Sequence, residues 1–220
     1  IDPENVRRLT TEKTKAVVAV DFTAQSVELD ALLSHCHEKG ITLIEDGAHV
    51  IGTKYKGRCN GSIADMTTLS FHPVKTVTCG EGGAVLTNDE NLYRKLLLYR
   101  AHGITRDPSL MEHEPDGPWY YEQLTLAMNY RMTDMQAALL ISQLKKLPMF
   151  MERRKEIVKR YNEAFSKLPQ IIVQKEIRES DTTRHLYILS LIPLKLSIDG
   201  RQFFDWVAAE NIWCNVHYIP

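Results

Sequence analysis

The sequence has 220 residues, enough for one or two domains with a sizeable core. Hydrophobic residues make up 44% and charged residues 25%, values typical of globular proteins that exclude a disordered chain, a collagen-like fibre and a membrane bundle. The 27 basic and 28 acidic residues nearly cancel, so no overall positive charge attracts nucleic acid or anionic lipid.

Strand and helix patterns alternate through the first hundred residues. Helical spacing of leucines after Ser26, and again after Asn88 or Asp89, predicts two helices, and Gly40 should end the first. Short apolar runs predict strands at 15–20, 41–44, 66–71 and 83–87. This alternation predicts an α/β fold with a mostly parallel sheet covered on both sides.

The second half of the chain has a different organisation. Residues 103–128 are polar and contain three prolines, which predicts a long functional loop. Thr133 and Gln136 form a capping-box pattern that begins a helix. Pro148 is expected to interrupt this helix, and a second helical stripe then continues to Leu168. The remaining residues predict an α+β piece made of a strand, a helix and a last strand, at 185–192, 201–210 and 213–217.

Both ends of the chain are unusual. It begins at Ile1 without an initiator Met and stops at Pro220 directly after an apolar stretch, so we expect an internal segment of a longer protein. The four cysteines are widely spaced, and no Cys-x-x-Cys pair, signal-peptide pattern or apolar run of about 20 residues occurs. These features predict a cytoplasmic protein with no metal site, no membrane partner and no nucleic-acid partner.

Three polar residues follow predicted strands at one edge of the sheet. Asp46 comes after the second strand, Ser70 closes the third, and Lys75 lies in the turn behind it. Ligands of open α/β sheets bind beyond the carboxyl ends of the strands. Pyridoxal phosphate (PLP) chemistry uses such a set, because a lysine bonds to the PLP aldehyde, a carboxylate pairs with the pyridine nitrogen, and hydroxyl and backbone groups hold the phosphate.

Each of these residues also has an ordinary structural interpretation. Asp46 could cap a helix, Lys75 could be a solvated surface charge, and Ser70 could be a plain strand residue. Gly80–Gly83 could form a simple tight turn, and it is not a phosphate loop of the Gly-x-x-x-x-Gly-Lys type, since no Lys-Ser or Lys-Thr follows. From spacing alone, the PLP interpretation is a minority hypothesis.

Longer motifs add a family resemblance. The segment around Asp46 reads Ile-Glu-Asp-Gly-Ala-His, and the segment that ends at Lys75 reads Ser-Phe-His-Pro-Val-Lys ahead of Gly-Glu-Gly-Gly. These motifs closely resemble those of the DegT/DnrJ/EryC1/StrS nucleotide-sugar aminotransferases, and similar segments extend along essentially all 220 residues. The matching segments are 44–49, 64–75, 80–88, 100–104, 129–134, 136–139, 143–144 and 215–220.

The resemblance implies an aspartate-aminotransferase-like fold, PLP fold type I. Residues 1–130 would form part of the PLP-binding large domain without its N-terminal portion, 131–168 the bridging helices, and 169–220 the start of a truncated small α+β domain. Relatives carry an upstream segment that holds the PLP phosphate and a continuation past Pro220. A non-catalytic, dimerising segment is therefore an alternative to an active chain.

The resemblance also assigns roles to individual residues. Lys75 should bond to the PLP aldehyde and move the proton, and Asp46 should pair with the pyridine nitrogen. His49 occupies the place of a Gln or His near the ring's 3-hydroxyl, and Ser70 should hold the phosphate. Asn129 should reach the phosphate of the partner subunit's cofactor, which implies a homodimer with shared active sites.

Within the family, Val20-Asp21-Phe22 and the lysine turn are most similar to the pseudaminic acid branch. That branch aminates the C4 ketone of a UDP-4-keto-6-deoxy-N-acetylhexosamine, with glutamate as the usual amino donor. The alternative is the same reaction on another nucleotide keto-sugar, a dTDP-hexose or a UDP-pentose. His72, His102 and His217 are further candidates to line the pocket.

Overall fold

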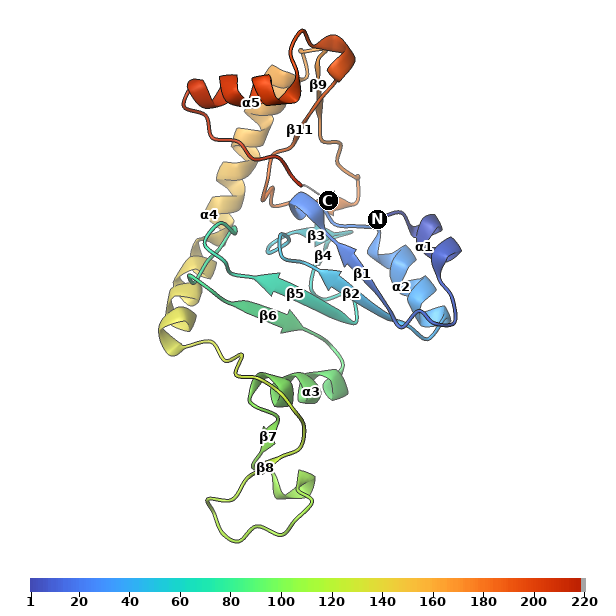
Figure 1. The fold of residues 1–220 in the computed structure, drawn as a ribbon, viewed down its shortest axis with the longest axis vertical. Helices are drawn as coiled ribbons and strands as arrows, with labels where there is room; N and C mark the ends of the chain where they lie inside the picture. Colours follow the sequence, from blue (N-terminus) through green and yellow to red (C-terminus); the bar gives the residue numbers. More distant parts are fainter. Residues whose placement is uncertain (219–220) are drawn as a thin grey trace.

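The computed structural model describes residues 1–218, whose centre is a four-stranded sheet (Figure 1). Its strands are β1 (Ala16–Val20), β2 (Thr42–Asp46), β5 (Met66–Ser70) and β6 (Gly83–Leu86), in the order β1-β2-β5-β6. The first three strands are parallel, and β6 is antiparallel to β5. The predicted α/β fold with a mostly parallel sheet is therefore confirmed.

One face of this sheet is covered and the other is open. Side chains alternate along β1, so Val17 and Ala19 are buried while Val18 and Val20 are 56% and 47% exposed. The covered face packs against α2 (Leu29–Glu38), which contacts α1 (Pro3–Leu9). The expected cover on both sides is wrong for the described residues, because no helix among them packs on the Val18 face.

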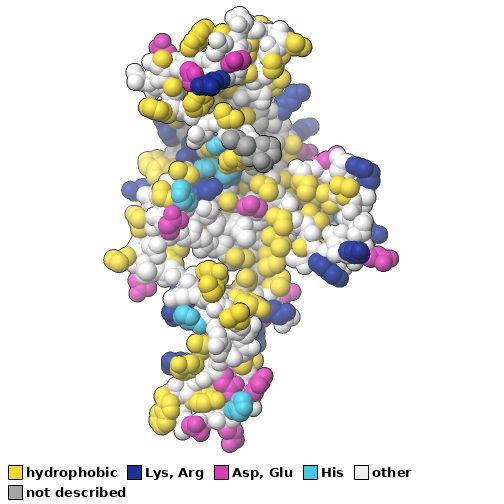
Figure 2. Space-filling model, viewed as in Figure 1, with side chains coloured by type: hydrophobic (Ala, Val, Ile, Leu, Met, Phe, Trp, Pro, Cys, Tyr) yellow, Lys and Arg dark blue, Asp and Glu magenta, His cyan; other side chains and the backbone are white. Residues whose placement is uncertain are grey.

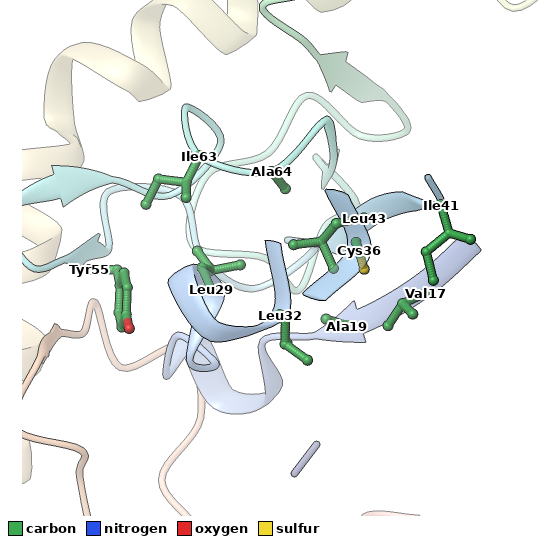
Figure 3. Packing of buried hydrophobic residues seen from close by; sticks show 10 residues of the cluster. All are labelled: Val17, Ala19, Leu29, Leu32, Cys36, Ile41, Leu43, Tyr55, Ile63 and Ala64. Carbon is green, nitrogen blue, oxygen red and sulfur yellow. The ribbon is translucent and has the colours of Figure 1, made fainter. Parts of the chain in front are cut away.

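The core of the covered face is a cluster between the sheet and α2 (Figure 3). Leu29 and Leu32 of α2 meet Leu43 of β2, and all three are fully buried. Burying such a side chain stabilises the fold by about 1.5–3 kcal/mol. The cluster is completed by Val17, Ala19, Cys36, Ile41, Tyr55, Ile63 and Ala64.

A single 32-residue helix, α4 (Asp134–Phe165), replaces the two expected bridging helices. The predicted capping box at Thr133 and Gln136 is present. The predicted interruption at Pro148 is wrong, because Pro148 lies inside the helix on its exposed side. Residues before and after the proline, Leu140 and Phe150 among them, pack on the same cluster around Phe71, Val77 and Cys79, which holds both halves in line.

The segment between the sheet and α4 projects away from the body (Figure 1). After α3 (Glu90–Arg100) it forms a short antiparallel hairpin, closed by a single-turn helix (Pro108–Leu110) and further loop. The hairpin strands are β7 (Ile104–Thr105) and β8 (Glu122–Gln123). The long polar loop expected at 103–128 therefore contains a hairpin.

The C-terminal part contains two small antiparallel pairings and one helix. Strand β9 (Ile171–Val173) pairs with β11 (Leu189–Leu191), and α5 (Gly200–Ala209) confirms the predicted helix. β11 occupies only part of the strand expected at 185–192. The last strand expected at 213–217 is wrong: these residues form no strand, and Trp213 is 87% exposed with no neighbouring chain to pair with among the described residues.

A small three-stranded sheet joins the C-terminal part to the first half of the chain. Its order is β10-β3-β4, with β10 (Ser180–Asp181) pairing to β3 (Lys54–Tyr55) and β3 to β4 (Arg58–Cys59). This pairing brings residues near 180 to the loop that follows β2. Across residues 1–218, no helix combines the length and the apolar character needed to cross a membrane.

Candidate active site

Asp46 is the last residue of β2 and lies on the open face of the sheet. Its neighbour Glu45 points to the covered face and is fully buried, whereas Asp46 is only half-buried. The Asp46 carboxylate accepts a hydrogen bond from the Ala48 N–H at 3.2 Å. The strand therefore delivers a carboxylate to the sheet edge at which parallel strands place ligands.

Lys75 lies in the turn between β5 and β6. Its backbone N–H donates to the His72 carbonyl at 3.0 Å, and the turn is tied back by the Phe71 N–H, which donates to the Gly82 carbonyl at 2.8 Å. Burial lowers the pKa of the Lys75 amine, and the nearby Asp46 carboxylate partly opposes this effect. The two predicted reactive residues therefore lie close enough to interact electrostatically.

His49 is the third residue of this group, three positions after Asp46 in the loop that follows β2. Its Nδ1 accepts a hydrogen bond from the Thr23 N–H at 3.2 Å. Burial lowers the pKa of His49 to about 4, and Lys75 and His217 add to the effect. At neutral pH the ring is uncharged, and because Nδ1 is the acceptor, the proton is on Nε2. His49 therefore offers an Nε2–H donor.

Ser70 and Asn129 are placed differently. Ser70 ends β5 at the same edge as Asp46, and its hydroxyl is within 3.5 Å of the His72 N–H. The exposed Asn129 lies at the base of the hairpin, where its side-chain oxygen accepts a hydrogen bond from Arg131 Nε at 3.0 Å. Among residues 1–218 no hydrogen bond joins Asn129 to Asp46, His49 or Lys75, so this chain does not bring it into that group.

The other histidine candidates divide between the site and the surface. His217 lies near the site, with its ring centroid 6.3 Å from that of Phe22. His72 is an exposed residue of the lysine turn. His102 lies at the base of the hairpin, 3.5 Å from Arg131. Figure 2 shows several histidine side chains gathered at the junction between the sheet and the C-terminal part.

Two residues of the site were not predicted from the sequence. Phe22 has its ring centroid 5.9 Å from that of His49, and His185 has its ring centroid 4.4 Å from it. His185 comes from a distant segment, which the pairing of β10 with β3 and the contact of Thr183 with Thr53 bring near. The chain has eight histidines, and no local sequence pattern distinguishes His185 from the others as a site residue.

The chemistry of the site is that of one amine, one carboxylate and neutral imidazoles. In the described part of the chain, no group of three or more His, Cys, Asp or Glu side chains is arranged to hold a metal ion. His49 and His185, whose pKa values are lowered to about 4 and about 3, add no positive charge beside Lys75 at neutral pH. An amine with a lowered pKa beside a carboxylate can act as a nucleophile and can move protons.

Comparison with known proteins places this geometry in a family. The model of the DegT/DnrJ/EryC1/StrS aminotransferase family matches residues 1–220. The UDP-4-amino-4,6-dideoxy-N-acetyl-beta-L-altrosamine transaminase of Campylobacter jejuni (serotype O:23/36) is 37% identical over 205 residues, which are 93% of this chain and 52% of the relative.

Two solved structures agree with this match over the whole fold. Helicobacter pylori PseC, an aminotransferase of pseudaminic acid biosynthesis, superimposes with a TM-score of 0.90 at 30% identity, covering 100% of this chain and 57% of PseC. The PLP-form of a candidate sugar aminotransferase, Spr1654 from Streptococcus pneumoniae, gives a TM-score of 0.85 at 30% identity, covering 99% of this chain and 58% of Spr1654.

These matches confirm the predicted family and its aspartate-aminotransferase-like fold. The chain spans about half the length of the relatives it matches. Pyridoxal phosphate is the cofactor indicated by the family and by the PLP-form neighbour. The chain belongs to the DegT/DnrJ/EryC1/StrS aminotransferase family.

Proposed function

We propose that this chain carries the lysine-bearing part of an aminotransferase that acts on a nucleotide sugar. The reaction would move an amino group from glutamate to the C4 ketone of a UDP-4-keto-6-deoxy-N-acetylhexosamine. The observation that carries the proposal is the convergence of Lys75, Asp46 and His49 at one edge of the sheet. The whole enzyme's activity is a proposal, because the chain spans only part of its relatives.

The residues present fit PLP. The Asp46 carboxylate would pair with the pyridine nitrogen, and the Nε2–H of His49 would donate to the oxygen at the ring's 3-position. The Ser70 hydroxyl, at the same edge, would bind the phosphate. When bound, PLP supplies an electron sink for a carbanion beside the amino nitrogen.

Lys75 has two tasks in this proposal. Because burial lowers the pKa of its amine, a larger fraction of the amine is unprotonated and nucleophilic than in a solvated lysine. Once displaced by the amino donor, the same amine can take a proton from the donor carbon and later return one to the sugar carbon. Asp46 meanwhile provides the negative charge that keeps the pyridine nitrogen protonated.

We also propose a homodimer whose subunits share their active sites. Large apolar side chains are exposed on the hairpin and its base, where Trp119 is 71%, Leu126 88% and Tyr130 71% exposed. Several large exposed apolar side chains on one segment suit a protein interface. Asn129 lies beside Tyr130, so a second copy docked on this segment would receive Asn129 near its own cofactor, as the resemblance implies.

The substrate assignment rests on the names of two relatives. The C. jejuni relative is named for an aminated N-acetyl-altrosamine, and the H. pylori structure for pseudaminic acid biosynthesis. At 30–37% identity these names support a nucleotide-sugar substrate, and the particular sugar is the finer proposal. The cytoplasmic location and the division at residues 130 and 168 stay predictions, which cell fractionation and limited proteolysis test.

The decisive experiment uses the full-length protein mixed with PLP. We expect a visible absorbance band from lysine-bound cofactor, loss of this band on adding glutamate, and its return on adding the UDP-4-keto-hexosamine. The dTDP-4-keto-hexose and UDP-4-keto-pentose should restore the band more slowly. No band in the wild-type protein, or a normal band in Lys75→Ala, would overturn the proposal. Lys13→Ala, which changes an exposed lysine distant from Lys75 in the sequence, is the matched control.

A further inference from the structure

The site contains a residue to which the proposed chemistry gives no task. His185 is 7% exposed, and its ring lies against His49, with the ring planes inclined at 41° and the centroids 4.4 Å apart. Its Nδ1 is buried and has no hydrogen-bond partner among the described residues. A buried polar atom without a partner opposes folding, so packing by itself does not explain a histidine here.

The backbone around His185 is held from two sides. The Thr183 N–H donates to Thr53 Oγ1 at 3.1 Å, which ties the segment to the loop after β2. Arg154 of α4 donates through Nη1 to the carbonyls of Arg184 and His185, both at 3.1 Å. These contacts fix the chain on either side of the ring.

The same segment carries a strained residue. Arg184 has a φ of +57°, a left-handed conformation that side chains with a Cβ adopt at a cost. Such strain persists only where the surroundings impose it, and it concentrates at functional sites. The segment is therefore held by Arg154 and Thr53 in a conformation that places the buried His185 ring against His49.

We infer that His185 is a positioning residue, whose ring walls one side of His49 and holds it in the orientation in which Thr23 donates to Nδ1. This inference rests on the proposed function, in which His49 Nε2–H faces the cofactor oxygen. Loss of the wall would admit water to His49 and free its ring to turn. The Nε2–H donor would then no longer be held in place.

The groups that set the charge around His49 are few. Lys75, Asp46 and His217 act on the His49 pKa, and His185 is uncharged at neutral pH because burial lowers its pKa to about 3. Removing His185 therefore removes no charge. A change in the titration of His49 would report solvent access and orientation.

The test follows the His49 ring by nitrogen-15 NMR in the full-length protein without cofactor. In His185→Ala we expect the pKa of His49 to rise by about one unit or more from about 4, because water reaches the ring. In His185→Phe, which keeps a ring of similar shape, the pKa should stay low and the Nε2–H form should persist. His37→Ala, an exposed residue near the end of α2, is the control and should leave the His49 titration unchanged.

An unchanged His49 titration in a folded His185→Ala protein would overturn the inference. The inference would also fail if His185→Phe unfolded at the wild-type temperature but showed the same raised His49 pKa as His185→Ala. The Nδ1 atom of His185, and not the packing of its ring, would then be what acts on His49. Should His185→Ala fail to fold, Arg154→Met releases the same segment without touching either ring. It should shift the His49 titration in the same direction, and no shift there counts against the inference.

A second measurement separates this inference from the proposed function. In the PLP-loaded protein, the pH dependence of the cofactor absorbance should move in His185→Ala and return to wild type in His185→Phe. If the protein binds no PLP, the proposed function fails, while the NMR titration still decides the role of His185.

Discussion

Glu45 and Asp46 are neighbours at the end of β2, yet they serve opposite faces of the sheet. On the covered face, Glu45 is fully buried and accepts three hydrogen bonds, from Thr67 Oγ1 at 2.6 Å, Asn60 Nδ2 at 2.7 Å and the Gly61 N–H at 3.0 Å. On the open face, Asp46 accepts only the local Ala48 N–H among the described residues.

A second carboxyl group strengthens the contrast. Asp21, also fully buried behind the sheet, accepts from the Val27 N–H at 2.7 Å and from Asn60 Nδ2 at 3.0 Å. Burial, with the adjacent Glu45, raises the pKa of Asp21 to about 9, so it carries a proton at neutral pH. The covered face thus keeps Asp21 neutral and supplies both carboxyl groups with hydrogen-bond donors.

The difference separates structural polar groups from functional ones. A buried polar group whose hydrogen bonds are all made within the protein stabilises one conformation and has no hydrogen-bonding capacity left for a ligand. Asp46, Lys75 and His49 lie close together with donor and acceptor capacity to spare, which is the condition for binding a cofactor. The comparison predicts that substitutions on the two faces separate activity from stability.

Lys75→Ala should give the largest effect, a fall in kcat of about 10³-fold or more, because it removes the group that moves the proton. The free energy of unfolding should change little, since Lys75 supports no packing in the core clusters. Steady-state kinetics and denaturant unfolding of the full-length protein check both statements. Retention of a tenth of wild-type activity would contradict the role.

Asp46→Asn should lower kcat by about 100-fold, because a neutral amide no longer stabilises the charge on the pyridine nitrogen. Its effect on unfolding should stay within about 0.5 kcal/mol, as for other substitutions outside packed or saturated positions. Equal kcat values for wild type and variant would remove Asp46 from the site. A large loss of stability would instead erase the contrast between the two faces.

Glu45→Ala should show the reverse pattern, a destabilisation of about 2–4 kcal/mol, because three donors, among them the fully buried Thr67, lose their acceptor. The milder Glu45→Gln keeps one oxygen acceptor and should cost less. Urea unfolding measures the difference. A Glu45→Ala protein as stable as wild type would show that the covered face does not depend on this network.

Asp21→Asn should show its effect in the pH dependence of stability. The folded protein keeps the Asp21 proton up to about pH 9, whereas the unfolded chain releases it near 3.8. The native state therefore binds more protons between these values, and the free energy of unfolding falls as pH rises, by up to about 1.4 kcal/mol per pH unit.

Asp21→Asn removes this contribution, so the variant should gain stability relative to wild type as pH rises from 6 to 9. Subtracting the two curves cancels the opposite contributions of His49 and His185, whose lowered pKa values favour folding as pH rises through 3 to 6.5. Parallel stability curves for the two proteins would show that Asp21 is not protonated in the fold.

Much of the site could be predicted because it lies on local motifs. Asp46 and His49 sit in one short segment, and Lys75 occupies the turn that follows the next strand of the sheet. Strand patterns and parallel order predicted that Asp46, Ser70 and Lys75 meet at one edge, whereas the role of His49 came only from the family resemblance. His185 could not be predicted, because the pairing of two-residue strands that delivers it has no periodic signal.

The errors in the fold have physical causes outside the local sequence. Pro148 was expected to end a helix, since it lacks an N–H, but packing of Leu140 and Phe150 on one cluster outweighs that lost bond. The strand expected at 213–217 has apolar residues of the right kind. It has no neighbouring strand in the described chain, and a strand needs a partner for its backbone groups.

Because α4 is unbroken, the number of residues between its two ends fixes the direction in which each end faces. Leu147 packs beside the lysine turn's cluster, and Tyr161 contacts Tyr187 with ring centroids 5.1 Å apart, two residues beyond His185. Each residue inserted between them would rotate the far end by about 100° and advance it by about 1.5 Å. Insertions into α4 between Leu147 and Tyr161 should therefore disrupt the packing of one end at almost every insertion length.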